Sequence, residues 1–246
     1  MVDRLFAEPE LAALYDRFCA WDRRDDLAFY LPLVLAAGRV LDVGCGTGML
    51  LRRARQEGHA GRLCGLDPAA AMLGIARPRR DIDWIEGDLS TVGFDQEFDL
   101  VVMTGHAFQV LTGDAELATA LAAIARALAG NGRFAFETRN PLARGWERWT
   151  PANAESVTGP DGQPVGQAHA VQLPVTGELV SFTSTYTSPA WDQPRVSRST
   201  LRFVGASALA GLLSAAGFMV EEQYGDWDRQ PLSTSSPEII TIARRA

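Results

Sequence analysis

The segment that most constrains this chain is an apolar run that ends in three alternate glycines, Arg39-Val40-Leu41-Asp42-Val43-Gly44-Cys45-Gly46-Thr47-Gly48. Such glycines let the backbone turn sharply and let a ligand approach the main chain closely. The helical pattern that follows would offer unpaired N–H groups and a partial positive charge to the same loop. The segment therefore predicts a strand–loop–helix unit with a ligand site at the loop, and a turn without a ligand is the alternative.

Glycine spacing separates the known nucleotide-binding loops. A dinucleotide fingerprint needs Gly-x-Gly-x-x-Gly, but Met49 or Leu51 stands where the third glycine belongs, depending on which pair starts the motif. A phosphate-binding P-loop needs a lysine, and all 23 basic residues are arginine. The absence of lysine also removes Schiff-base and lysine general-base mechanisms.

Two carboxylates follow the next two expected strands. Asp67 ends the run Leu63-Cys64-Gly65-Leu66-Asp67, where a carboxylate can accept hydrogen bonds from both hydroxyls of a ribose. Asp88, in Glu86-Gly87-Asp88-Leu89, can accept from an adenine amino group. Either aspartate alone is more often a helix cap. Together, beside the glycine loop, they favour a nucleoside site.

Short apolar runs alternate with helical patterns along the rest of the chain. We expect strands over 39–43, 62–66, 82–86, 98–103, 132–138, 218–224 and 237–243, and helices over 48–57, 69–76, 114–129 and 206–216. Strands joined by helical crossovers imply an α/β fold, here a doubly wound seven-stranded sheet.

Three regions are expected. Residues 1–38 read as two helices that cover the site, the first starting at Pro9 and the second weakened or kinked by Pro32. Residues 39–139 and 204–246 form the core. Residues 140–203 are rich in Gly, Pro, Ser and Thr and alternate in polarity, which predicts an antiparallel β insertion of three or four strands acting as a substrate lid.

The motifs, taken together, resemble those of the class I S-adenosylmethionine-dependent methyltransferases. Residues 40–48 resemble the first motif of that family, and three later segments follow in its order and spacing: Gly65-Leu66-Asp67 with Met72-Leu73, Gly87-Asp88, and Phe98 to Met103. The resemblance covers residues 39 to about 138 well and the end of the chain more loosely. It implies a Rossmann-like fold, S-adenosylmethionine as cofactor and methyl transfer as the activity.

The resemblance also implies which residues bind the cofactor: Tyr15, Asp42, Gly44, Cys45, Gly46, Gly48, Asp67, Pro68, Met72, Asp88, Leu89 and Thr104. The glycines would approach the methionyl part, and Asp42 would help to hold its ammonium. Asp67 would take the ribose, and Asp88 with the Leu89 amide the adenine. Pro68 departs from the family, which has an aromatic residue there, so adenine packing must come from elsewhere.

His106 is the candidate catalytic residue, because the resemblance places it at the end of strand four, facing the methyl group. It could be a base, a substrate ligand or a hydrogen-bonded wall residue. Glu137 and Arg139, at the end of strand five, could pair with each other or contact the substrate. His59 is expected on the surface, and His169 is expected within a strand of the insertion.

Aromatic residues are numerous on both sides of the expected site: Tyr15, Trp21, Phe29 and Tyr30, then Trp146, Trp149, Tyr186 and Trp191. They either pack the insertion against the core or form two sides of a lid whose aromatic faces stabilise a cation. The segment 224–229 either closes the pocket or forms a turn.

Bulk properties limit the partners. The net charge of −7 and a pI near 5.0 argue against a nucleic acid. The first residues lack the charged-then-apolar pattern of a signal peptide, and no apolar run is long enough for a membrane span, so we expect neither. Three cysteines without metal-ligand spacing lead us to expect a cytoplasmic protein without a metal site. A small-molecule acceptor and a monomer or homodimer are expected. The alternatives are a non-catalytic binder of S-adenosylmethionine or S-adenosylhomocysteine that regulates a partner, a methyltransferase with a protein acceptor and, disfavoured by the glycine spacing, an NAD-dependent oxidoreductase.

Overall fold

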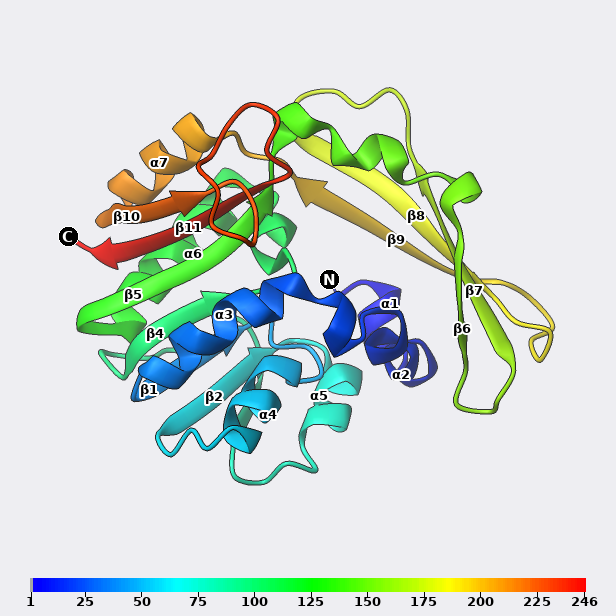
Figure 1. Ribbon diagram of the computed structural model, residues 1–246, viewed down its shortest axis with the longest axis horizontal. Helices are drawn as coiled ribbons and strands as arrows, with labels where there is room; N and C mark the ends of the chain where they lie inside the picture. The colour runs from blue at the N-terminus through cyan, green and yellow to red at the C-terminus, as the bar shows by residue number, and fades with distance from the viewer. Residues whose placement is uncertain (1) are drawn as a thin grey trace.

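A seven-stranded sheet forms the centre of the protein, and a four-stranded sheet projects from one end of it (Figure 1). The computed structural model describes residues 2–246. The strand order of the larger sheet is β10-β11-β5-β4-β1-β2-β3. Its strands are β1 (Arg39–Val43), β2 (Arg62–Asp67), β3 (Asp83–Glu86), β4 (Phe98–Met103), β5 (Leu128–Arg139), β10 (Phe218–Tyr224) and β11 (Glu238–Arg245).

Strands β1 to β5 pair in parallel, and β11 is antiparallel to both β5 and β10. The chain runs from β1 outward to β2 and β3, then returns to β4 on the other side of β1. In sheets of this kind a crevice opens where the order reverses, at the carboxyl ends of β1 and β4. The glycine loop leaves β1 at this crevice. The predicted α/β, doubly wound, seven-stranded fold is confirmed.

Helices cover both faces of this sheet, which explains why its central strands are almost wholly apolar. On one face α3 (Asp25–Ala36) and α4 (Met49–Gln56) pack on Val40, Leu100 and Val102. On the other face α6 (Asp114–Ala127) and α7 (Ala206–Ala215) pack on the buried phenylalanines of β4 and β5. The remaining core helix is α5 (Ala70–Ala76).

The N-terminal region touches both sheets. It consists of α1 (Arg4–Ala7), α2 (Pro9–Phe18) and the 3-10 turn η1 (Trp21–Arg23), followed by α3. Pro9 starts α2 as expected, whereas α3 continues through Pro32. Leu11 and Leu14 of α2 pack on Val165 and Tyr186 of the smaller sheet. Ala12, on another face of α2, packs on Met72 of α5.

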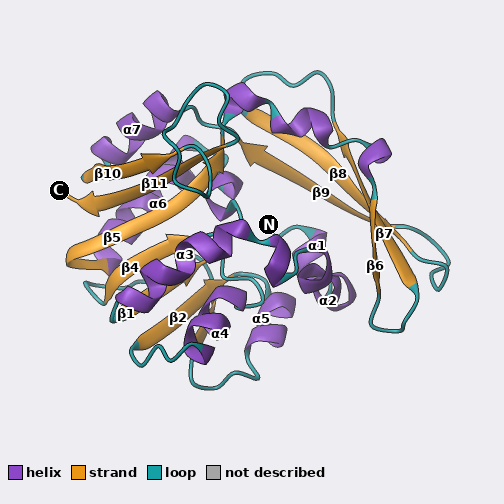
Figure 2. Cartoon of the chain, in the orientation of Figure 1, coloured by secondary structure: helices purple, strands orange, loops and turns teal. Residues whose placement is uncertain are grey.

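The segment between β5 and α7 forms the smaller sheet (Figure 2). Its antiparallel strands are β6 (Glu155–Thr158), β7 (Pro164–Val171), β8 (Leu179–Thr187) and β9 (Arg195–Arg202). Three 3-10 turns precede them: η3 (Pro141–Ala143), η4 (Gly145–Arg148) and η5 (Pro151–Asn153). The predicted antiparallel insertion is present with four strands, and the turns before it were not predicted. The helix η2 (Ala107–Val110) follows β4.

Two local predictions were wrong. The helix expected to reach residue 129 ends at Ala127, and β5 begins at Leu128, which pairs with Phe98 of β4. His59, expected on the surface, is 6% exposed, and its Nε2 lies 2.7 Å from the carbonyl oxygen of Ala37. His59 therefore joins the end of α4 to the segment before β1.

Candidate active site

The glycine loop turns as its sequence demands. Gly44, Gly46 and Gly48 have φ values of 74°, 56° and 73°, in the left-handed region that favours glycine. The amide of Gly44 donates to the carbonyl of Leu66 at 2.8 Å, which holds the loop against the end of β2. The amide of Gly46 donates to Asp67 Oδ2 at 2.7 Å. The loop is thus built jointly by β1 and β2.

Gly48 has a packing reason of its own. A Cβ atom at this position would lie 2.2 Å from the ring of Trp84, and one at Gly65 would lie 2.5 Å from the same ring. Trp84 is fixed by a hydrogen bond from its Nε1 to the carbonyl of Arg79 at 2.8 Å. Glycine at 48 and 65 is therefore explained by tryptophan packing without any ligand. Cys45, predicted at the cofactor site, is buried, and its Sγ lies 2.7 Å from the Cβ position of Gly65.

Asp42 provides the clearest sign of a missing positive charge. It is 1% exposed, and its Oδ1 has no hydrogen-bond partner among residues 2–246. Burial, together with the nearby Asp67, raises the pKa of Asp42 to about 8. A buried carboxylate oxygen without a partner at the base of a glycine loop suits a ligand ammonium, so the site fits the methionyl part of S-adenosylmethionine.

Asp67 is placed as the sequence predicts. It is buried, and its Oδ1 accepts from the amide of Ala69 at 2.8 Å while its Oδ2 accepts from Gly46. Each carboxylate oxygen can accept a second hydrogen bond, which leaves capacity for the two hydroxyls of a ribose. Burial raises the pKa of Asp67 and the two amides lower it. Pro68 beside it is exposed, and Met72 places its Cε 3.2 Å from the Cβ position of Gly46.

The side chain of Asp88 accepts hydrogen bonds from its own turn. Its side chain is exposed, and Oδ1 accepts from the amide and hydroxyl of Ser90, at 2.9 and 2.6 Å, and from the amide of Thr91 at 3.1 Å. These hydrogen bonds hold its pKa below the ordinary value. The carboxylate caps a turn, as an isolated aspartate commonly does. Its role with adenine, and that of the half-buried Leu89, remains a prediction.

The N-terminal region reaches the same edge of the sheet through Tyr15 and Arg24. A Cβ atom added at Gly105 would lie 3.1 Å from Nη2 of Arg24 and 3.8 Å from the hydroxyl of Tyr15. Burial raises the pKa of Tyr15 to about 12, partly offset by Arg24. Arg24 also pairs with the buried Asp26 at 2.6 Å. Thr104, just before Gly105, is buried as well.

Asp16 ties the N-terminal region to the glycine loop. Its Oδ1 accepts from Thr47 Oγ1 at 2.6 Å, and its Oδ2 lies 3.1 Å from Nη2 of Arg52. Tyr15 was predicted at the site from the sequence, whereas Asp16 and Arg24 were not. The pair Tyr15-Asp16 and the charged turn at residues 22–26 were the available signals.

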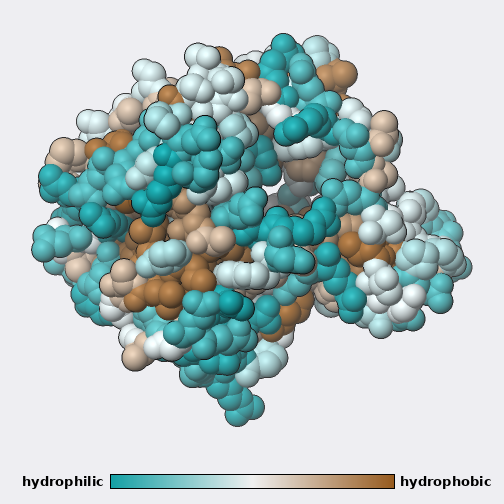
Figure 3. Space-filling model, in the orientation of Figure 1, coloured by the Kyte–Doolittle hydropathy of each residue, from teal (hydrophilic) through white to brown (hydrophobic). Residues whose placement is uncertain are grey.

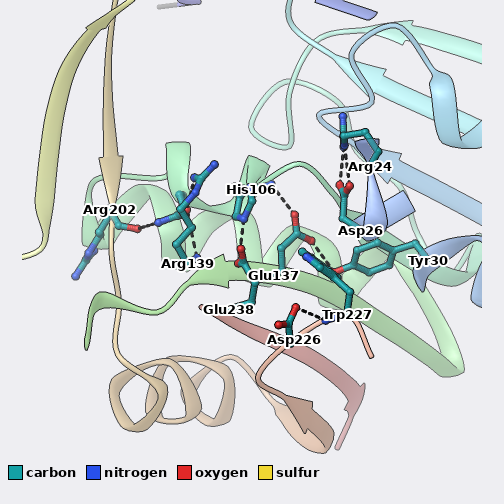
Figure 4. Close-up of polar contacts among 11 residues, drawn as sticks. Arg24, Asp26, Tyr30, His106, Glu137, Arg139, Arg202, Asp226, Trp227 and Glu238 are labelled. Carbon is teal, nitrogen blue, oxygen red and sulfur yellow. Dashed lines mark hydrogen bonds and ion pairs between the residues drawn. The ribbon is translucent and has the colours of Figure 1, made fainter. Parts of the chain in front are cut away.

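His106 lies within a hydrogen-bonded network (Figure 4). Its backbone has a φ of 63°, and its amide donates to Glu137 Oε1 at 2.6 Å. Tyr30 donates to the other oxygen of Glu137 at 2.6 Å, while His106 Nε2 lies 3.0 Å from Glu238 Oε2. Burial is the main cause that lowers the pKa of His106 well below its usual range and raises the pKa of Glu137 and of Glu238 to about 8. Near neutral pH the imidazole is therefore uncharged.

Arg139 does not pair with Glu137, which corrects one of the two interpretations drawn from the sequence. Both oxygens of Glu137 are taken by Tyr30 and His106. Arg139 instead donates from Nη1 to Gln109 Oε1 at 3.0 Å, and its guanidinium carbon lies 5.1 Å from the ring centre of Trp149.

The loop after β10 packs on α3. Trp227 makes edge-on contacts with Phe29 and Tyr30, with ring centres 6.1 and 6.4 Å apart. This loop therefore supports Tyr30, which in turn holds Glu137 (Figure 4).

The surface is hollowed where the core, the N-terminal helices and the smaller sheet meet (Figure 3). Among residues 2–246 no group of three or more His, Cys, Asp or Glu side chains could hold a metal ion. In the same part of the chain no helix is long and apolar enough to cross a membrane.

Comparisons with known proteins agree with this geometry. Residues 40–132 match the model of a methyltransferase domain family. The chain is 33% identical to the cypemycin N-terminal methyltransferase of Streptomyces sp over 50% of either chain. It is 43% identical to the 2-phytyl-1,4-naphtoquinone methyltransferase of Thermosynechococcus vestitus over 34% of this chain and 42% of that protein. The chain thus spans half or less of the length of these two relatives.

Solved structures share the fold over nearly the whole chain. The CcbJ methyltransferase of Streptomyces caelestis aligns with a TM-score of 0.72 at 19% identity, over 97% of this chain and 99% of its own. CalS10, an S-adenosylmethionine-bound amino pentose methyltransferase of Micromonospora echinaspora, aligns with a TM-score of 0.68 at 23% identity over 91% of each chain. The sheet order and the glycine loop define a doubly wound α/β protein with a crevice at the carboxyl ends of β1 and β4. Within that class, residues 40–132 are similar to a methyltransferase domain, and the whole chain shares the fold of solved S-adenosylmethionine-dependent methyltransferases.

Proposed function

We propose that the protein transfers the methyl group of S-adenosylmethionine to a small-molecule acceptor. The observation that carries the proposal is the convergence of Asp42, Asp67 and Tyr15 on the crevice between β1 and β4, under a hollow bordered by the smaller sheet. Similar proteins with small acceptors support it, among them a naphtoquinone methyltransferase and two sugar methyltransferases.

Each of these residues would contact a different part of S-adenosylmethionine. Asp67 would accept from the ribose hydroxyls, and Asp42 would face the methionyl ammonium across the glycine loop. Arg24, against Gly105, brings positive charge that would favour the methionyl carboxylate. The predicted contributions of Pro68, Met72, Asp88, Leu89 and Thr104 belong to the same proposal.

Methyl transfer from a sulfonium needs alignment and exclusion of water more than acid–base chemistry, because the leaving group is already good. The N-terminal helices and residues 140–203 would supply this enclosure as two sides of a lid. Where the acceptor must lose a proton, His106 would be the nearest candidate to take it, with Glu238 fixing the ring; burial keeps the imidazole uncharged but also weakens it as a base.

The first test is binding of S-adenosylhomocysteine, measured by calorimetry. Asp67→Ala should weaken it at least about tenfold, since two charge-assisted hydrogen bonds are lost. Asp192→Ala, at an exposed position of the insertion, should leave it unchanged. An unchanged affinity in Asp67→Ala, or binding of NADH in place of S-adenosylhomocysteine, would refute the cofactor site.

Release of S-adenosylhomocysteine from S-adenosylmethionine, assayed with a panel of small molecules, tests the activity. A protein that binds the cofactor but turns over only with a protein substrate would refute the small-molecule acceptor. Binding with no turnover on either kind of acceptor would favour a regulatory binder.

A further inference from the structure

Arg139 is a charged side chain that makes no ion pair among the described residues; the nearby Glu238 and Glu137 act on it only from a longer distance. It ends β5, where its neighbour across the sheet is Glu238 of β11. Within residues 2–246 no carboxylate oxygen lies within 4.0 Å of its guanidinium, and Glu238 is engaged with His106. Its side chain is mostly buried, and burial lowers its pKa.

The guanidinium is nevertheless held firmly. Gln109 accepts from Nη1, and Gln109 is itself 1% exposed and donates to the carbonyl of Arg202 at 3.0 Å. Trp149 packs on one face of the guanidinium and is backed by Phe182 of β8, with ring centres 4.8 Å apart. Guanidinium has five N–H donors, so this arrangement fixes its direction while leaving donors for a ligand.

The surroundings of Arg139 belong to the acceptor side of the site. Figure 4 shows the Arg139 guanidinium beside the His106 imidazole, between it and the strand that carries Arg202. His169 of β7 contributes a further polar group, with Nδ1 2.9 Å from Ser184 Oγ. Burial, with a smaller contribution from the charge of Arg139, lowers the pKa of His169. A charge removed from water and left without a partner is costly unless a ligand of opposite charge completes it.

We propose that Arg139 binds an oxyanion, carboxylate or phosphate, of the methyl acceptor, so that the substrate is a small anionic molecule. This rests on the proposed function, and it adds the chemical class of the acceptor. The planar fork of arginine matches both oxyanions, and the reacting atom of the acceptor would lie on the His106 side.

The test measures binding of four aromatic probes by calorimetry, with and without saturating S-adenosylhomocysteine: benzoate, phenyl phosphate, benzamide and benzylamine. Benzoate or phenyl phosphate should bind at least about tenfold more tightly than the neutral benzamide, as expected for a charge-assisted contact. Which of the two binds better distinguishes a carboxylate from a phosphate substrate. Equal binding of benzoate, phenyl phosphate and benzamide, preference for benzylamine, or no binding of any probe would overturn the proposal.

Three variants locate the site. Arg139→Gln should weaken the oxyanion probe at least about tenfold, and Arg139→Lys, which keeps the charge but not the fork, by less. Arg148→Gln, an exposed arginine in η4, should have no effect. All three should keep the affinity for S-adenosylhomocysteine.

The outcomes separate the two proposals. If Arg139→Gln weakens S-adenosylhomocysteine binding instead, Arg139 serves the cofactor and the inference about the acceptor is wrong. If the wild-type protein fails to bind S-adenosylhomocysteine, the proposed function fails, while probe binding without it still tests the oxyanion site. The comparison of benzoate with benzamide uses the wild-type protein and does not depend on the folding of any variant.

Discussion

At the scale of single residues, the uncompensated carboxyl of Asp42 connects stability with ligand binding. Its pKa is about 8 in the folded protein and near 4 in an unfolded chain, so the folded state holds an extra proton between these values. Stability therefore falls as pH rises through this window, because the proton that favours folding is lost. Glu137 and Glu238, with pKa values of about 8, act in the same direction.

Replacing Asp42 by asparagine should remove the part of the stability loss at high pH that the Asp42 carboxyl causes. We expect the melting temperature of Asp42→Asn, relative to wild type, to rise as the pH increases from about 5 to about 9, while S-adenosylhomocysteine binds more weakly. Differential scanning fluorimetry across this range measures the first effect and calorimetry the second. Asp192→Asn is the exposed control, and a melting difference for Asp42→Asn that does not depend on pH would contradict the account.

Gly48 gives a prediction based on packing. Gly48→Ala should destabilise the fold by about 2–4 kcal/mol, because the new methyl meets Trp84 and the backbone is left-handed. Adding Trp84→Leu to Gly48→Ala should restore only the part of the lost stability that the clash with Trp84 causes, and not the part caused by the left-handed backbone. Gly74→Ala in α5, where a Cβ meets nothing within 4 Å, should be neutral or stabilising. Chemical denaturation of wild type, the two single variants, the double variant and Gly74→Ala decides, and additive effects of Gly48→Ala and Trp84→Leu would refute the clash.

At the scale of elements, Asp16 holds α2 over the glycine loop. Asp16→Ala removes its contacts with Thr47 and Arg52, so hydrogen exchange of the α2 amides should accelerate. Affinity for S-adenosylhomocysteine should fall about 3- to 10-fold, because Tyr15 is no longer held at Gly105. Asp22→Ala, exposed in η1, should leave both unchanged. Unaltered exchange in Asp16→Ala would show that packing alone fixes α2.

The strands were predictable where their signal is local. The bounds of β1 and β4 were predicted correctly, because each is an apolar run with polar residues or glycine beyond it. The start of β5 was not, since Asn131-Gly132 reads as a helix stop, whereas the early start at Leu128 depends on pairing with Phe98. That pairing is a property of the sheet and leaves no mark in the local sequence.

The candidate site was likewise predictable only where its signal lies in the local sequence. The glycine loop and Asp67 form one local pattern and were found from it. Glu238 lies 132 residues from His106 along the chain, and only the antiparallel return of β11 beside β5 brings the two together. Gln109, which orients Arg139, was likewise invisible, because an isolated glutamine after a strand has no distinguishing pattern.

At the scale of the whole molecule, helix α2 is shared between two bodies. Its Leu11 and Leu14 pack on the smaller sheet, while Ala12 packs on the core at Met72. The same helix carries Tyr15 toward the end of β4 and Asp16 toward the glycine loop. The helix therefore packs on the smaller sheet with one side and on the core with another, while Glu10, Ala13 and Arg17 face the solvent.

If the protein binds a methyl donor and an acceptor as proposed, this shared helix couples the release of the two ligands. Lifting α2 from the glycine loop also strips apolar contacts from Tyr186 and Val165, so the free energy of opening includes both interfaces. A molecule bound on one side that holds α2 down lengthens the residence of a molecule on the other. If the proposed function holds, thermodynamic reciprocity requires that donor and acceptor strengthen each other's binding by the same factor.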